Sequence, residues 1–218
     1  MADMVITNTG ISNGTGSGTS LTISHTVGAG NLQAVYFMFA FFGSPSGLSV
    51  TYAGTAMTFI ANSGQCYIYR LVNPPMGTNN AVASVTGGTA SRGVVVSYSG
   101  VHQTNPNDTA VTSFGTGTTP SVSVSSAAGK LVIDFVYATR SLNQSIGLSI
   151  GAGQSNIYTT AGFVSDSNDG TIASSYEAGA GTNTMTWSYT AGGGGDTSWG
   201  QAALSINPAP ETSFFSMF

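Results

Sequence analysis

The chain has 218 residues, of which only 6% are Asp, Glu, Lys or Arg, against about 25% in an ordinary soluble domain. Its four scattered basic residues, Arg70, Arg92, Lys130 and Arg140, and its net charge of −4 exclude a basic patch that tracks phosphates or a membrane surface, so we expect neither partner. The single cysteine, Cys66, excludes an intrachain disulfide and a cysteine metal cluster, and we expect it to be a small buried side chain.

The N-terminal residues differ in composition from the rest. The whole chain is 41% hydrophobic, with eleven Phe and nine Tyr, so its low charge does not predict disorder. Residues 7–20, by contrast, are almost entirely Thr, Ser, Asn and Gly, and we predict a flexible arm over residues 1–20. No basic region followed by an apolar run is visible at the start, which predicts synthesis in the cytoplasm without a secretory leader.

Strand patterns follow along the chain. Residues 21–27 alternate apolar and polar side chains with a period of two, which predicts a half-buried strand with His25 on its polar side. Similar alternation recurs at residues 81–85, 121–125, 182–189 and 202–206. Other segments are apolar at nearly every position, which predicts central strands covered on both faces; they are residues 34–42, 93–96 and 131–137.

Turn-forming residues separate these segments. Clusters of Gly, Pro, Asn and Asp occur at residues 43–47, 73–77, 105–108 and 191–196. The sequence therefore predicts an all-β, jelly-roll-like β-sandwich of about a dozen strands with little or no helix. We predict a single domain over residues 21–207, since internal repetition is weak. Residues 115–120 could separate two halves, but a crossover loop explains them equally well.

The chain ends in an apolar tail, residues 208–218, which starts with a Pro-Ala-Pro break. Its large side chains are unfavourable to leave in water, so we predict that they fold back onto the body or dock on another chain. These candidate interaction residues are Phe214, Phe215, Met217 and Phe218.

No catalytic constellation stands out. Residues 10–14 have the G-x-S-x-G spelling of a nucleophile elbow, but no helix is expected after them and a Gly/Ser-rich chain produces such matches by chance. His25 and His102 are predicted to be surface or loop residues, with a general base oriented by Asp108 or Asp134 as the alternative. Because Asp134 lies within an apolar strand, we expect it to find a structural partner such as an arginine.

Two groups of residues resemble ligand sites. Asp166, the acidic turn after it and Glu177 resemble a calcium loop, but the glycine falls at position 5 instead of 6, so an ordinary Asn-Asp-Gly turn is preferred to a structural ion. Trp187 and Trp199, with Tyr residues nearby, would stack on a sugar if exposed, although burial in the core is the commoner outcome for Trp. We predict no cofactor, no metal and no catalytic residue.

Several strand-and-turn phrases resemble those of β-sandwich virion or surface proteins encoded by tailed bacteriophages and bacteria. They are residues 49–57, 69–75 and 96–101, and the resemblance extends over about residues 20–207. It implies a jelly-roll-like fold and a virion or surface role, and it assigns no functional residue.

These observations lead to a functional hypothesis. We predict a structural virion protein, a capsid decoration (cement) subunit that contacts capsid protein and copies of itself as a trimer. The alternative is a tail-fibre or baseplate module that binds a host glycan. An enzyme, such as a glycosidase, is the third hypothesis.

Overall fold

The computed structural model describes residues 5–140, 147–159, 169–190 and 197–210, and these form fifteen β-strands with no helix among them. Every strand pair in this part of the chain is antiparallel. The predicted all-β, sandwich-like fold is confirmed. No helix in the described ranges has the length and apolar character needed to cross a membrane.

Residues 7–99 form what we call the first sandwich. Its strands are β1 (Thr7–Ser17), β2 (Ser20–Val27), β3 (Ala34–Tyr52), β4 (Thr55–Ala56), β5 (Thr58–Ser63), β6 (Cys66–Val72) and β7 (Gly77–Ser99). The sheet has the order β1-β7-β3-β6-β5, with β2 on β7 and β4 on β3. The register of β3 against β7 shifts between Phe42 and Ser49, where both long strands bend. The sheet therefore folds over itself and encloses an apolar cluster that includes Phe37, Phe39 and Phe41.

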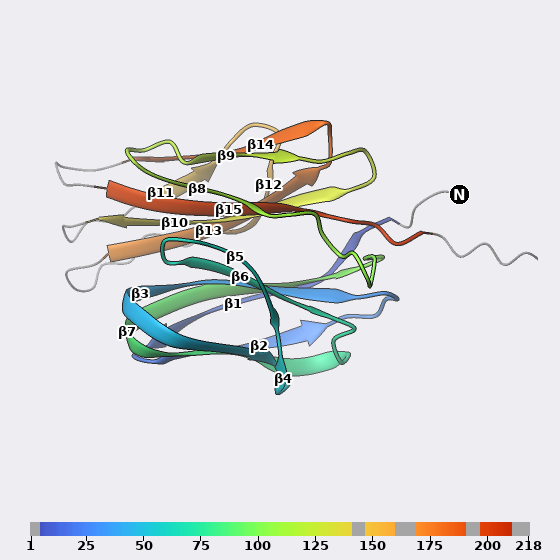
Figure 1. Cartoon of the computed structure of the whole chain (residues 1–218), viewed down its shortest axis with the longest axis horizontal. Coiled ribbons are helices and arrows are strands. Elements are labelled where there is room, and N and C mark those ends of the chain that lie inside the picture. The colour runs from blue at the N-terminus through green and yellow to red at the C-terminus, as the bar shows by residue number, and fades with distance from the viewer. Residues whose placement is uncertain (1–4, 141–146, 160–168, 191–196, 211–218) are drawn as a thin grey trace, which may run out of the picture.

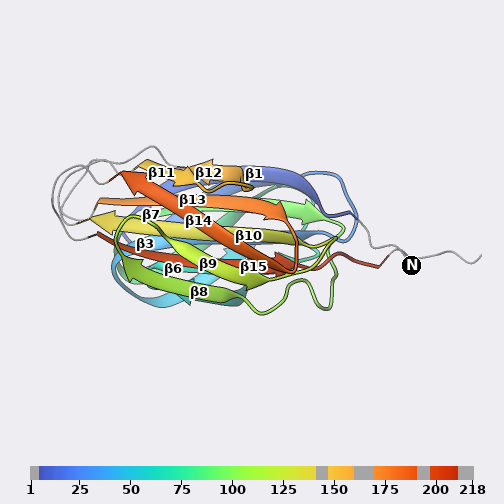
Figure 2. The ribbon, with the colours of Figure 1, turned by 90° about the horizontal axis from the view of Figure 1, so that it is seen from above.

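Residues 111–206 form the second sandwich. Its strands are β8 (Val111–Thr116), β9 (Ser121–Ser125), β10 (Leu131–Arg140), β11 (Gly147–Ile150), β12 (Ser155–Thr159), β13 (Asp169–Ala178), β14 (Thr182–Thr190) and β15 (Thr197–Ile206). The inner sheet has the order β12-β13-β10-β15-β8 and the outer sheet the order β11-β14-β9. β14 crosses obliquely over β10 and β13 (Figure 2). Two apolar clusters fill the space between these sheets.

The second sandwich repeats the strand order of the first. β1-β7-β3-β6-β5 corresponds to β8-β15-β10-β13-β12, and the outer strand β2 corresponds to β9. The outer halves of the bent strands β3 and β7 correspond to the separate strands β11 and β14. Gly18 follows β1 with a φ of 69°, and Gly117 follows β8 with a φ of 92°. In each sandwich the carbonyl of the next residue, Thr19 or Thr118, accepts a hydrogen bond from a backbone N–H of an outer strand, β7 or β14. The chain is thus two copies of one topology, although its sequence suggests little repetition.

The inner half of the folded sheet of the first sandwich packs face to face against the inner sheet of the second sandwich. The molecule therefore has four layers (Figure 1). The apolar core between them takes residues from both sandwiches. Cys66 Sγ donates to the carbonyl of Phe135 at 3.4 Å, and Ser174 Oγ lies 3.7 Å from Met38 Sδ. Strands β3, β7 and β10 have apolar clusters on both faces, which confirms the prediction from their continuous apolar runs.

The predicted N-terminal arm differs from the structure. Residues 7–17 form β1, which pairs with β7 along its length. Small residues occupy alternate positions because β2 passes very close. A Cβ on Gly10 would lie 2.4 Å from the carbonyl oxygen of Thr26, and a Cβ on Gly16 would lie 2.4 Å from that of Ser20. The Gly-rich composition that suggested an arm is therefore a packing requirement of a strand.

Candidate functional site

A buried carboxylate lies at the centre of the second sandwich. Asp134 on β10 has no exposed surface. Its Oδ1 accepts from Ser175 N at 2.9 Å and from Ser175 Oγ at 2.6 Å. Its Oδ2 accepts from Trp187 Nε1 at 2.6 Å and from Gln201 Nε2 at 2.7 Å. Neutral donors on β13, β14 and β15 therefore hold this side chain, and they replace the arginine that the sequence led us to expect.

This network extends to the outer sheet. Gln154 Nε2 donates to Ser175 Oγ at 2.6 Å, and Gln154 Oε1 accepts from the backbone N of Thr186 at 2.8 Å. Burial raises the pKa of Asp134 to about 6, against hydrogen bonds from Ser175, Trp187 and Gln201 that lower it. Because Asp134 is enclosed, it can tie the outer sheet to the inner one but cannot touch a molecule that arrives from solvent.

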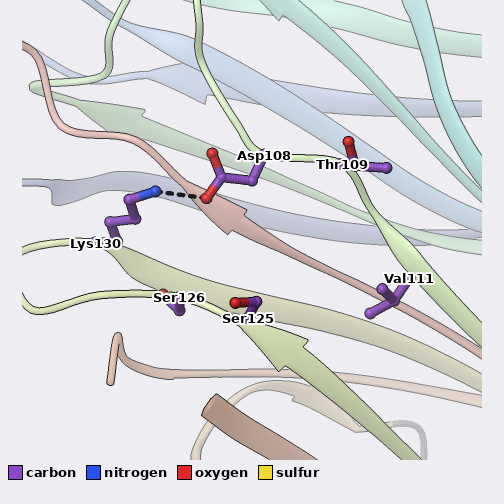
Figure 3. Close-up of a pocket in the computed structure, with 6 residues that line it drawn as sticks. All are labelled: Asp108, Thr109, Val111, Ser125, Ser126 and Lys130. Carbon is purple, nitrogen blue, oxygen red and sulfur yellow. Dashed lines mark hydrogen bonds and ion pairs between the residues drawn. The ribbon is translucent and has the colours of Figure 1, made fainter. Parts of the chain in front are cut away.

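A shallow surface pocket of about 440 Å³ lies where β8, β9 and β10 begin or end (Figure 3). Lys130 Nζ lies 2.5 Å from Asp108 Oδ2 at its rim, and both side chains are partly exposed. The lining is otherwise small and mostly hydroxyl-bearing; it consists of Asp108, Thr109, Val111, Ser125, Ser126 and Lys130.

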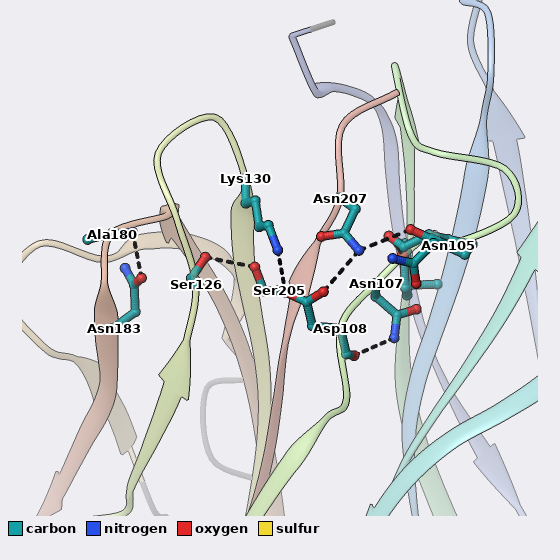
Figure 4. A network of polar contacts seen from close by, with 11 residues as sticks. Asn105, Asn107, Asp108, Ser126, Lys130, Ala180, Asn183, Ser205 and Asn207 are labelled. Carbon is teal, nitrogen blue, oxygen red and sulfur yellow. Dashed lines mark hydrogen bonds and ion pairs between the residues drawn. The ribbon is translucent and has the colours of Figure 1, made fainter. Parts of the chain in front are cut away.

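Asparagines extend this polar region across the end of the molecule (Figure 4). Asn207 Nδ2 donates to Asp108 Oδ1 at 3.1 Å and to the carbonyl of Asn105 at 3.0 Å, while Asn107 Nδ2 donates to the carbonyl of Asp108 at 2.8 Å. Burial alone would raise the pKa of Asp108, but hydrogen bonds from Lys130 and Asn207 and the charge of Lys130 together lower it. These contacts hold the loop before β8 against β15, and they engage both carboxylate oxygens of Asp108.

Replacing Lys130 by Met is expected to lower the free energy of unfolding at pH 7 by less than about 1 kcal/mol, because the ion pair is partly exposed. The lowered pKa of Asp108 means that its contribution is present above the pKa of an unfolded Asp and disappears as the pH falls. Urea denaturation should show a small difference from the wild type at pH 7 and a smaller one at pH 3, because the contribution is lost as the pH falls through the lowered pKa of Asp108. A loss well above 1 kcal/mol would contradict this account.

The histidines do not form a catalytic pair with an acid. His25 is buried, not on the polar side of β2 as predicted, and burial lowers its pKa to about 4. Its Nδ1 lies 3.0 Å from Ser12 Oγ and its Nε2 lies 3.1 Å from Ser97 Oγ, so a serine occupies the place of an orienting carboxylate. His102 Nδ1 accepts from the backbone N of Asn105 at 3.1 Å and orders its own loop.

Ser12 belongs to the G-x-S-x-G spelling, and the structure brings it to a histidine that sequence reasoning did not pair with it. The motif lies within β1, and a strand supplies neither the sharp strand-to-helix turn nor the oxyanion donors that an elbow needs. The Ser12–His25 contact is therefore part of the packing between β1 and β2.

Cys66 is fully buried, as predicted, and burial raises the pKa of its thiol well above the ordinary value. The calcium-like segment is only partly described, since Asp166 lies outside the described residues. Glu177 Oε1 accepts from Asn183 Nδ2 at 2.5 Å. Within the described ranges no three His, Cys, Asp or Glu side chains gather as a metal site.

The aromatic residues that could stack on a sugar lie mostly in the core. Trp187, Trp199 and Tyr189 are 2%, 7% and 5% exposed, and they pack between the sheets of the second sandwich. The burial expected for the two Trp residues is confirmed, and the alternative sugar platform is not formed by these three residues. Phe59 and Phe114, each more than half exposed, are the exposed rings that the sequence did not single out.

The candidate interaction residues Phe214, Phe215, Met217 and Phe218 lie outside the described residues. Sequence reasoning also missed Gln154 and Gln201, whose amides complete the Asp134 network. Gln201 sits at a polar position among small residues of β15, and only its three-dimensional neighbours distinguish it from a surface glutamine.

Comparisons with known proteins add no family. No family model and no curated protein matches the sequence. Among solved structures, a tryptophan-to-tyrosine variant of oxalate decarboxylase from Bacillus subtilis matches with a TM-score of 0.17 and 7% identity, over 96% of this chain and 78% of that chain. A likeness this slight assigns neither fold nor activity.

Proposed function

We propose that the chain is a structural virion protein, a decoration subunit on the outer surface of a phage head. The observation that carries the proposal is the low charge of a four-layered β body, since only 6% of the residues are Asp, Glu, Lys or Arg. The charged and nucleophilic groups discussed above are buried or engaged in contacts that hold the fold together.

The outward faces of the two outer layers show this surface chemistry. Along β2 every second residue is exposed, and these residues are Ser20, Thr22, Ser24 and Thr26. Thr26 Oγ1 and Thr78 Oγ1 are 2.8 Å apart on the first sandwich, and Ser123 Oγ and Thr184 Oγ1 are 3.1 Å apart on the second. The two outer faces of the molecule therefore both present hydroxyl groups that pair across strands.

The three basic side chains that the structure describes are engaged or buried. Lys130 pairs with Asp108, Arg70 Nη1 donates to Asn107 Oδ1, and Arg92 is only 6% exposed. Packing such a surface against a neighbour removes few charges from water, and removing charges from water is the largest penalty in forming a polar interface. Low net charge also leaves little repulsion between copies held close together.

The role that fits is mass-action stabilisation. A subunit that binds only the assembled shell shifts the equilibrium toward that shell. Contacts with capsid protein and with copies of itself, arranged as a trimer, are the partners we propose.

Purified particles of the virus that encodes the chain provide the test. We expect the chain at a fixed ratio to capsid protein, and electron cryo-microscopy should show it on the outside of the head. Heads stripped of the chain should melt at a lower temperature and regain stability when the purified chain is added. Absence of the chain from particles, or its presence on the tail alone, would contradict the proposal.

A further inference from the structure

Three aromatic side chains form an exposed cluster on β5 and β6, and we call Phe59, Tyr67 and Tyr69 the aromatic patch. Phe59 is 51% exposed, and the two tyrosines are partly exposed. Phe59 pairs with Tyr69 across the two strands, and their ring centroids lie 5.4 Å apart at an interplanar angle of 69°. Tyr67 lies two residues before Tyr69 and so on the same face of β6. The three rings are therefore neighbours on one surface.

A buried ring on β3 orients both tyrosines. The centroid of Phe39 lies 5.5 Å from that of Tyr67 and 5.8 Å from that of Tyr69, at interplanar angles of 19° and 20°. Phe39 itself has no exposed surface. Both tyrosine rings are therefore held nearly parallel to one buried ring, so the aromatic patch is ordered before any ligand arrives. Such preorganisation lowers the entropy lost on binding.

The second sandwich shows that the fold does not require aromatic rings at these positions. In the repeated topology, the residue of β13 that corresponds in register to Tyr69 is Ser175. The residue that corresponds to Tyr67 is Ala173. Both are small and have no exposed surface, and β14 crosses over this strand (Figure 2). One copy of the topology thus covers small residues, while the other displays two tyrosines, so their role is not the building of the sandwich.

Polar groups accompany the exposed rings. Asn62 is exposed and pairs with Tyr67 across the strands, so its amide lies on the same face as the aromatic patch. The amide and the two tyrosine hydroxyls can both donate and accept hydrogen bonds. The face of an aromatic ring carries partial negative charge, which attracts the C–H groups on the apolar face of a sugar ring. Rings and polar groups together match the two kinds of surface that a sugar presents.

We infer that the aromatic patch, with Asn62, is a binding site for neutral oligosaccharides. The one charged side chain of β5 and β6 is Arg70, whose Nη1 donates to Asn107 Oδ1. Successive side chains of a strand point to opposite faces, so Arg70 is turned away from its neighbour Tyr69. Neither strand therefore presents a charge to the ligand, which suits a chain of uncharged hydroxyl-bearing sugars and disfavours an acidic one.

The size of the aromatic patch favours a glycan over a protein partner. An aromatic side chain has about 150–250 Å² to bury, so three partly exposed rings offer a few hundred Å². Each partner in a stable protein interface buries about 800 Å². A short glycan can cover the patch completely, whereas a second copy of the chain would need a much larger surface.

An array of neutral and acidic glycans, probed with the full chain, tests the site. Dense display lets weak contacts add up, so a shallow site is detected. We expect neutral oligosaccharides to be bound in preference to acidic ones, and isothermal titration calorimetry then gives the affinity for the neutral glycan bound best. If the chain bound no neutral glycan, or acidic glycans alone, the inference would be overturned.

Substitutions in the aromatic patch should weaken this affinity. Phe59→Ala is expected to weaken it about tenfold and to lower the melting temperature by no more than a few degrees, because the ring is half exposed. Tyr69→Phe keeps the ring and loses the hydroxyl, so it should weaken binding less than Tyr69→Ala. The matched control is Tyr176→Ala, which removes a 37% exposed tyrosine on β13 and should leave binding unchanged. Equal effects of Phe59→Ala and Tyr176→Ala would contradict a site on β5 and β6.

Amide chemical shifts locate the bound glycan. Titrating it into the isotope-labelled chain should shift the amides of residues 58–63 and 66–72 more than those of residues 169–178. Sedimentation velocity of the wild type and Phe59→Ala should give the same mass. A smaller mass for Phe59→Ala would identify the aromatic patch as a contact between copies, and shifts confined to other strands would place the glycan elsewhere. Either result overturns the inference.

The inference goes beyond the proposed function and does not depend on it. A chain that binds neutral glycans through β5 and β6 but is absent from virus heads keeps this inference and loses the proposed function. A chain that decorates heads but binds no neutral glycan keeps the proposed function and loses this inference.

Discussion

Replacing Asp134 by Asn is expected to lower the free energy of unfolding at pH 7 by about 3 kcal/mol, although the side chain hardly changes shape. Each carboxylate oxygen accepts from one donor that cannot become an acceptor. These donors are the backbone N of Ser175 on Oδ1 and Nε1 of Trp187 on Oδ2. The amide NH2 of Asn must face one of them in either orientation. Urea denaturation followed by tryptophan fluorescence measures the loss.

Asp108→Asn is the matched control, because Asp108 is partly exposed and its partners can rearrange in water. We expect it to lower stability by less than about 1 kcal/mol. Ser175→Ala removes one hydroxyl donor and leaves the backbone donor in place, so its effect should lie between the two. If Asp134→Asn were as mild as Asp108→Asn, the donors around Asp134 would not be fixed as described.

The pH dependence of the same variant has a definite sign. The pKa of Asp134 in the folded chain, about 6, lies above that of an unfolded Asp, so the folded state binds the proton more tightly. That stabilisation is complete below about pH 4 and is lost as the pH rises to about 6. The stability gap between the wild type and Asp134→Asn should therefore be smaller at pH 7 than at pH 4. A gap that widens with pH would mean that hydrogen bonding outweighs burial.

Much of the fold could be predicted because hydrophobic patterning is local. Residues 34–42 and 131–137 are apolar on both faces of a strand, and this pattern has one physical explanation, a strand covered on both sides. The buried cysteine was predictable for the same reason. His25 was assigned to the wrong face because polarity was taken as exposure, whereas Ser12 and Ser97 satisfy both of its ring nitrogens inside the fold.

The repeated topology could not be predicted, because it lies in strand pairing and not in side chains. Phe37 and Asp134 each come three residues after the first paired residue of β3 and β10, yet one is a core aromatic and the other a buried carboxylate. Leu131 pairs with Ile206, far along the chain, and no local pattern encodes that register. For the same reason the donors around Asp134 were not foreseen: they come from three strands that only the fold brings together.

The N-terminal strand gives the second large expected effect. Gly16→Ala should lower the free energy of unfolding by about 3 kcal/mol, since the new methyl group would lie 2.4 Å from the carbonyl oxygen of Ser20 and 2.5 Å from Ser91 Oγ. Neither contact can be relieved by a side-chain rotation alone, because the first one is with backbone. β2 must move away from β1, and the core beneath β2 loses packing. Thermal and urea denaturation report the loss.

Thr15→Ala is the control, because Thr15 is the neighbouring residue on the exposed face of β1 and its side chain is not packed against β2. Its effect should stay below about 1 kcal/mol, the usual range for an exposed strand position. Amide hydrogen exchange supplies an independent measurement, since backbone groups of β1 that pair with β7 should be protected in the wild type and lose protection in Gly16→Ala. If both variants were equally mild and the amides of residues 10–16 exchanged freely, these residues would be a flexible arm after all. Their glycines would then reflect freedom of the chain and not the close approach of β2.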